Sequence, residues 1–148
     1  VQFAPESLAQ FAPDLVAQFD GIFNKPKIIY DALFKAAWET IVAFTGQNNK
    51  AGMISILHTW GQNLSLHPHI HCIIPGGFVN QNEVWKLSKS KGKFLFPVKA
   101  MSKVYRAKYV AILRASDLVI EQEIFDALFK KDWVVYAKRP FGSPASVV

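Results

Sequence analysis

Apolar residues recur at helical spacing in the clearest segment of this chain, residues 27–45. The apolar positions are Tyr30, Leu33, Phe34, Ala37, Trp38 and Ile41. Spacings of three and four residues place these side chains on one face of a helix, which favours packing against a sheet. Gly46 follows directly and suits the helix C-terminus, where a left-handed residue often ends the helix.

The same spacing predicts three further helices, over residues 5–19, 101–112 and 117–131. Pro13 could divide the first of them into two short helices, because proline removes a helical hydrogen bond. Asp117 is the predicted N-cap of the last helix, since its side chain can accept a hydrogen bond from a free N–H group.

Strand-like runs, rich in β-branched and aromatic residues, lie between these helices. They cover residues 53–60, 68–74, 78–79, 84–85, 94–96 and 133–137. The glycine- and asparagine-containing turn at 61–63 predicts that the first two runs form a hairpin. Strands joined by both hairpins and helices predict an α+β fold, with a mainly antiparallel sheet packed against helices. At 148 residues the chain fits one domain, 1–148.

Composition narrows the class of protein. A hydrophobic fraction of 51% and a charged fraction of 19% are typical of a globular protein. No apolar run reaches the length of about 18 residues that a membrane span needs, and no signal-peptide pattern is present, so we expect a cytoplasmic protein without a membrane partner. Cys72 is the single cysteine, which excludes an intrachain disulfide and a cysteine-rich zinc site within this sequence.

Candidate chemistry is concentrated in the run from His67 to Cys72. His69 and His71 are two residues apart on a predicted strand, so their side chains share one face and can converge on one divalent ion. Ile70 then faces the core. The alternative is that these are hydrogen-bonded histidines of a half-buried strand without a metal.

The third ligand depends on the register of the predicted hairpin. If Trp60 pairs with His69, His58 lies opposite His71 on the same face and becomes the third candidate. A slip of one residue would turn His58 to the other face. Gln62 or His67 could serve instead.

Positive charge is concentrated in the second half of the chain. Residues 1–80 have a net charge of −1, with four lysines and five acidic residues, whereas residues 81–148 have a net charge of +7, with thirteen basic and six acidic residues. The segment 86–114 contains nine basic residues and no acidic one. Such a block predicts contact with a polyanion, with nucleic acid favoured over a merely solvated face. The residues predicted to bind DNA are Lys86, Lys89, Lys91, Lys93, Lys138 and Arg139.

Three stretches together resemble the two-tyrosine HUH transposases of rolling-circle insertion sequences. They are residues 57–77, with His58, the His69-Ile70-His71 element and Pro75-Gly76-Gly77, and then residues 94–98 and 132–138, in the same order as in that family. The resemblance implies the palm fold of HUH endonucleases, with His69 and His71 holding a divalent ion. Magnesium or manganese is expected, and zinc is a further possibility because imidazole suits several metals.

The resemblance also implies a reaction and a partner. The reaction is attack by a tyrosine on a phosphate of single-stranded DNA at the transposon ends, which leaves a 5′-phosphotyrosine and a free 3′-hydroxyl. The alternative function is a non-catalytic basic nucleic-acid-binding domain with structural histidines.

Two departures from the family pattern shape the expectation for catalysis. The helix with the paired tyrosines is expected after the 137–142 stretch, and a cysteine-rich zinc-binding module is expected ahead of Val1. Neither is in this sequence. We therefore expect a partial catalytic domain that is inactive alone, with Tyr105, Tyr109 and Tyr136 in structural roles and the catalytic residue unknown.

Overall fold

A computed structural model of the chain describes residues 2–3, 24–60, 66–87, 96–130, 133 and 135–137. Several predicted features lie outside the described residues: the helix over 5–19, the turn at 61–63, most of the strand over 94–96 and the stretch from Lys138 onward. Within the described part of the chain, no helix is both long enough and apolar enough to cross a membrane.

The described elements comprise helices and antiparallel strands, which confirms the predicted α+β class. In chain order they are β1 (Gln2–Phe3), α4 (Pro26–Thr45), β2 (Ile54–Trp60), β3 (Leu66–Ile73), β4 (Gly77–Val79), β5 (Trp85–Leu87), α5 (Val98–Arg114) and α6 (Gln122–Lys130). Both sheets are antiparallel: one has the strand order β1-β3-β2, and the other is the β4–β5 hairpin.

Helix α4 confirms the prediction for residues 27–45 nearly to the residue. Pro26 begins it, which costs no hydrogen bond because the first N–H groups of a helix have no partner within it. Gly46 ends it with a φ of 90°, a conformation that glycine adopts without steric cost, and its N–H donates to the carbonyl of Val42. The buried face of α4 includes Leu33 and Ile41.

Helix α5 confirms the predicted helix over 101–112 and extends it at both ends, whereas the predicted start of the last helix at Asp117 is wrong. Helix α6 begins only at Gln122. The hydroxyl of Ser116 accepts the N–H of Leu118, so the chain turns directly after α5. Leu118 and Ile120 then pack against the core in an irregular conformation, which offsets the local preference for a cap at Asp117.

Strand β3 lies between β1 and β2 and begins at Leu66, two residues earlier than the start predicted beside Pro68. The pairing of β2 with β3 shifts next to this proline: His58 pairs with His69, but Trp60 pairs with Leu66. Pro68 therefore lies in a bulge, where its missing N–H group costs no ladder hydrogen bond.

The strands predicted over 78–79 and 84–85 are confirmed as β4 and β5, which pair as a hairpin, but the second strand continues further than predicted. Lys86 lies on β5, which ends at Leu87. The strand predicted over 133–137 is also wrong in extent, because among its described residues only Tyr136 takes part in a bridge. Burial still alternates there: Trp133, Val135 and Ala137 are buried, and Tyr136 is exposed.

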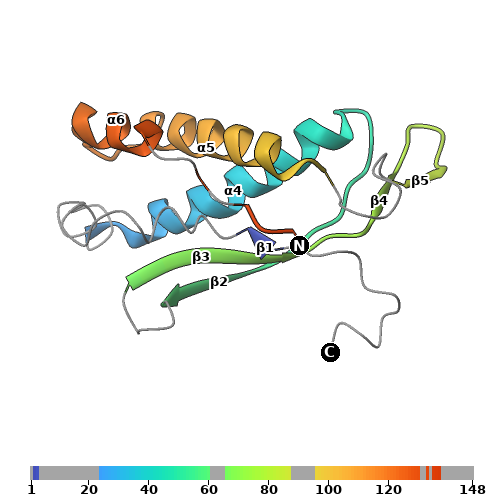
Figure 1. Cartoon of the computed structure of the whole chain (residues 1–148), viewed down its shortest axis with the longest axis horizontal. Coiled ribbons are helices and arrows are strands. Elements are labelled where there is room, and N and C mark those ends of the chain that lie inside the picture. Colours follow the sequence, from blue (N-terminus) through green and yellow to red (C-terminus); the bar gives the residue numbers. More distant parts are fainter. Residues whose placement is uncertain are drawn as a thin grey trace.

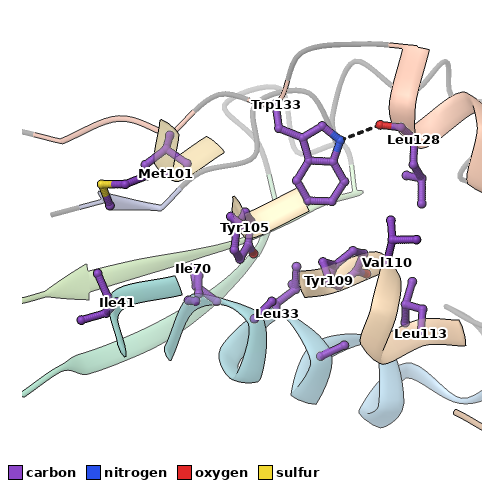
Figure 2. Packing of buried hydrophobic residues seen from close by; sticks show 14 of the residues in the cluster. Leu33, Ile41, Ile70, Met101, Tyr105, Tyr109, Val110, Leu113, Leu128 and Trp133 are labelled. Atoms are coloured by element: carbon purple, nitrogen blue, oxygen red, sulfur yellow. Dashed lines mark hydrogen bonds between the residues drawn. The ribbon is translucent and has the colours of Figure 1, made fainter. Parts of the chain in front are cut away.

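The helices gather on one side of the β1–β3–β2 sheet (Figure 1). Ile70 and Cys72 of β3 are buried on that side, as predicted for Ile70, in one cluster with residues of α4, α5 and α6. Figure 2 shows Ile70 beside Leu33 and Tyr105, and the indole of Trp133 donating to the carbonyl of Leu128 at 3.0 Å. This packing fixes which face of β3 points away from the helices.

Candidate metal centre

Three histidines lie on the face of the sheet that points away from the helices. On a strand, alternate side chains share a face, so burial of Ile70 and Cys72 turns His69 and His71 to the opposite face of β3. His58 on β2 is the direct antiparallel partner of His69, which places it on that same face.

The observed register differs from the one considered from the sequence. Pairing of Trp60 with His69 is wrong, because His58 takes that place and Ile56 lies opposite His71. The difference is two residues, and a shift of two keeps every side chain on its original face. His58 therefore remains on the histidine face.

The three imidazoles converge. The Nε2 atoms of His69 and His71 are 3.0 Å apart, and one nitrogen from each of the three rings lies within 4.8 Å of the others. Metal–nitrogen bonds are about 2.0–2.1 Å long, so two nitrogens on one ion lie about 3.0–3.4 Å apart. The pair of Nε2 atoms already has this spacing, and a small movement of the His58 ring would complete a three-nitrogen site.

The electrostatics of the cluster favour neutral imidazoles. Burial lowers the pKa of His71 below its usual value of 6.5, and the neighbouring rings of His58 and His69 lower it further, because two positive rings in contact would repel. A neutral imidazole has the free lone pair that a metal needs. The residues present therefore fit a divalent ion, with His69 buried and the other two half-buried.

The rim of the cluster is apolar and exposed. Ile54, Ile56 and Ile73 lie on the same face of the sheet, and their side chains are 67%, 57% and 47% exposed. Isoleucines on a covered sheet face would be buried, as Ile70 is on the other side. Among the described residues, this part of the histidine face is therefore open to solvent.

The other candidates for the third ligand are not placed. Gln62 lies outside the described residues, and only the backbone of His67 is described. Among the described His, Cys, Asp and Glu residues, the three histidines form the group that could hold a metal ion.

The predicted DNA-binding residues are placed only in part. Lys86 is exposed on β5, whereas Lys89, Lys91, Lys93, Lys138 and Arg139 lie outside the described residues. Their contact with DNA stays a prediction.

Several basic residues of the 86–114 segment make contacts within the protein. Arg106 lies over the ring of Phe129 at 5.1 Å, and Arg114 lies over the ring of Phe125 at 4.9 Å. Lys108 pairs with Glu39 at 3.4 Å. Half of the described basic residues in this segment therefore stabilise helix packing, which leaves Lys86, Lys99 and Lys103 exposed among those that the structure describes.

The tyrosines of α5 are structural, as expected. Tyr105 and Tyr109 are fully buried against Trp133, with ring centroids 5.6 and 5.4 Å from it. Burial raises the pKa of both phenols, so neither is poised to act as a phenolate nucleophile. Tyr136 is 50% exposed and differs from them in this respect.

Comparisons with known proteins bear on what this histidine face is for. A family model described as "Putative transposase" (Y2_Tnp) matches residues 52–148, which includes all three histidines. The chain belongs to this transposase family. No solved structure matches it.

Two curated relatives are transposases. One is "Putative transposase y4qJ" from Sinorhizobium fredii, 31% identical over 164 residues, an alignment that covers 97% of this chain and 38% of the relative. The other is the transposase for insertion sequence element IS801 from Pseudomonas savastanoi pv. phaseolicola, 34% identical over 66 residues, which covers 44% of this chain and 16% of the relative. The chain thus spans well under half of the length of either relative.

Proposed function

We propose that this chain is the metal-binding part of a transposase catalytic domain that cuts and rejoins single-stranded DNA at transposon ends. The observation that carries this proposal is the convergence of His58, His69 and His71 on the face of the sheet opposite the helices. Membership of a transposase family supplies the reaction class, and the His69-Ile70-His71 element resembles that of the HUH endonucleases.

The three imidazoles would hold the ion, magnesium or manganese by resemblance, although imidazole also suits zinc. When bound, a divalent ion supplies charge that neutralises the scissile phosphate. Other described residues position the histidines. The buried Ile70 and Cys72 fix which face of β3 carries His69 and His71, and the exposed isoleucines border the site.

The bond changes follow from the family resemblance. A tyrosine oxygen forms a bond to phosphorus, the bond from phosphorus to the 3′-oxygen breaks, and the proton lost by the tyrosine is balanced by the one that the 3′-hydroxyl gains. Tyr105 and Tyr109 are unsuited to this role because they are buried in the core. By the resemblance, the nucleophile is expected on a helix that follows the 137–142 stretch in the family.

A nicking assay on a longer transposase that contains this segment tests the proposal. The substrate is an end-labelled single-stranded oligonucleotide from the terminus of the element, incubated with manganese or with a chelator. Nicking should require the metal and should be lost in a His69→Ala/His71→Ala variant that still binds the oligonucleotide. Lys27→Ala, at an exposed position on α4, is the control and should retain nicking.

Metal-independent nicking, or nicking that survives the double substitution, would contradict the proposed role of the histidines. DNA binding with neither metal binding nor nicking would favour the alternative function, a non-catalytic nucleic-acid-binding domain.

A further inference from the structure

The β4–β5 hairpin is joined to the histidine-bearing strand by only three residues, 74–76. Figure 1 shows it at one end of the molecule, beyond the end of β3. The hairpin has its own hydrogen-bonded frame. The Asn80 side-chain oxygen accepts the N–H groups of Asn82 and Val84, both at 3.0 Å, and closes the turn.

The hairpin is also tied to the loop after α4. The backbone N–H of Lys50 donates to the carbonyl of Val79 at 2.7 Å, and the N–H of Val79 donates back at 3.0 Å. The ammonium group of Lys50 pairs with the carboxylate of Glu83. Hydrogen bonds and an ion pair on both sides of the turn hold the hairpin in one position before any partner binds.

A tryptophan ring lies across the face of this hairpin. Trp85 is paired with Val79, and its ring lies over Gly77 at the diagonal position. A Cβ atom at Gly77 would lie 2.8 and 2.9 Å from two ring atoms of Trp85, and it would collide with the carbonyl oxygen of Lys86. Glycine at 77 is therefore what allows the ring to lie against the backbone, and the Trp85 side chain remains 51% exposed.

The surroundings of Trp85 favour a polyanion. Lys86 is exposed on the same strand, and Lys89, Lys91 and Lys93 follow within seven residues in the sequence. The nearest acidic residue in the sequence, Glu83, is paired with Lys50. No acidic residue occurs in the sequence from residue 84 to residue 116. A partner must therefore offer negative charge at close intervals together with flat apolar groups that can cover an indole ring.

Single-stranded nucleic acid has both properties, since its phosphates are regularly spaced and its unpaired bases stack on aromatic side chains. We propose that the β4–β5 hairpin binds single-stranded DNA, with one unpaired base stacked on Trp85 and a flanking phosphate on Lys86. This inference rests on the proposed function, which supplies DNA as the partner. It adds Trp85, a residue that contacts a base, next to the basic segment 86–114, for which contact with the polyanion was expected.

The test compares two exposed tryptophans in the 148-residue chain. Trp38 on α4 is 40% exposed, lines a cavity of about 260 Å³ together with Glu39 and Lys108, and is the matched control. Fluorescence anisotropy with a labelled oligothymidylate measures affinity at several salt concentrations. Trp85→Ala should weaken binding at least about fivefold, whereas Trp38→Ala should leave it unchanged.

Two further readouts separate stacking from a structural role. Trp85→Phe should recover most of the affinity, because phenylalanine also stacks. The slope of log affinity against log salt should be the same in Trp85→Ala as in the wild type, because stacking releases no counterions. An oligonucleotide without bases should bind the wild type and Trp85→Ala equally.

Several results would overturn the inference. Equal affinity of Trp85→Ala and the wild type for oligothymidylate would leave the exposed edge of β5 as a surface for a protein partner. A loss of affinity that is equal for the oligonucleotide without bases, and that Trp85→Phe does not recover, would show that Trp85 only supports the fold. If the wild-type chain binds no single-stranded DNA at all, the proposed function fails together with this inference. If the wild type binds and Trp85→Ala binds equally well, only this inference fails.

Discussion

The three imidazoles of the cluster share one face of the sheet but not one environment. His69 is buried, whereas His58 and His71 are half-buried. The pKa of His71 is lowered by its burial and then by the two neighbouring rings. His71 therefore remains neutral to a lower pH than an isolated histidine would, and a neutral ring is the form that can bind a metal.

We expect affinity for manganese or zinc to fall as the pH drops below about 6.5, because protons then compete with the metal for the ring nitrogens. Because the pKa of His71 is lowered from its usual value of 6.5, protonation of this ring, and the loss of affinity that it causes, should come below pH 6.5. Isothermal titration calorimetry at pH 7.5, 6.5 and 5.5 measures this dependence.

Replacement of any one of the three histidines by alanine should reduce metal affinity by at least about tenfold at pH 7.5. Mutation of residues that only hydrogen-bond to metal ligands already reduces metal affinity by about this factor. Lys27→Ala, at an exposed position on α4, is the control and should bind the metal as the wild type does. Equal binding by the wild type and by the His69→Ala/His71→Ala variant would place the metal elsewhere.

The sequence alone could predict the pair His69 and His71, because strand periodicity requires no knowledge of the partner strand. It could not fix His58, because the side that His58 faces depends on the register of the hairpin. That register includes a bulge opposite Thr59, where the ladder shifts beside Pro68. Pro68 could indicate where a bulge is tolerated, but it could not indicate how many extra residues the bulge contains.

At the scale of secondary-structure elements, the basic residues divide into two groups. Arg106, Lys108 and Arg114 of α5 contact aromatic rings or a carboxylate of neighbouring helices, whereas Lys86 on β5 is exposed. Charge counted along the sequence could not separate these groups, because the partners of Arg106, Lys108 and Arg114 lie on helices α4 and α6, which are distant in the sequence. Among the described basic residues of the segment, Lys86 of β5 and Lys99 and Lys103 of α5 stay exposed, and their contact with DNA stays a prediction.

We expect that the triple substitution Lys89→Ala/Lys91→Ala/Lys93→Ala makes the slope of log affinity against log salt shallower by about 2. Each phosphate contact on single-stranded DNA contributes about 0.7 to that slope. Fluorescence anisotropy between 50 and 300 mM salt measures it.

The matched control removes three exposed lysines from α4 and its N-terminal flank: Lys25, Lys27 and Lys35. This variant has the same net charge as the triple variant and should keep the wild-type slope. If both variants change the slope equally, only net charge matters, and the lysines after β5 have no specific contact with DNA.

Helix lengths were predictable where the apolar stripe is long and closed by a glycine, as in α4. The start of α6 was not, because Asp117 has the chemistry of a cap but lies where the chain packs Leu118 and Ile120 on the core. Trp133 was expected on a strand, and its role is instead to link α6 and α5. Its indole donates to the carbonyl of Leu128, and its carbonyl accepts the hydroxyl of Ser102.

Trp133→Ala should therefore destabilise the chain by about 3–5 kcal/mol, the usual cost of removing a large buried aromatic side chain. Chemical denaturation followed by circular dichroism measures the free energy of unfolding. Trp38→Ala, at an exposed tryptophan on α4, is the control and should cost much less. A loss below about 1 kcal/mol in Trp133→Ala would show that the core does not depend on this link.

At the scale of the whole molecule, one face of the sheet is covered by helices and the other is bordered by exposed isoleucines around the histidines. An apolar surface of this kind usually marks a site of interaction. The curated relatives are much longer than this chain, which covers 38% and 16% of them. The α+β class and the pairing of β2 with β3 follow from local patterns, whereas the place of β1 on the other side of β3 was not predicted.

The last prediction concerns cleavage by the 148-residue chain. We expect it to bind single-stranded DNA and a divalent ion without cutting the DNA. A bound ion lowers the barrier only for a nucleophile held in line with the scissile bond. Tyr105 and Tyr109 are buried with raised pKa values, so neither can be that nucleophile.

Denaturing gel electrophoresis of end-labelled oligonucleotide, with and without manganese, measures both cutting and covalent linkage. A longer transposase that includes the helix expected after residue 142 should form a protein–DNA adduct at the 5′ side of the cut. The 148-residue chain should form none, and Tyr136→Phe should behave as the wild type does.

Each alternative result would identify a different nucleophile. An adduct formed by the 148-residue chain and lost in Tyr136→Phe would assign the attack to Tyr136, which is half exposed where the other two tyrosines of the comparison are buried. Cutting by the longer protein without an adduct would indicate attack by water. In that case the histidine cluster would still position the ion, but the reaction would be hydrolysis, and the energy of the broken bond would not be kept for rejoining the strand.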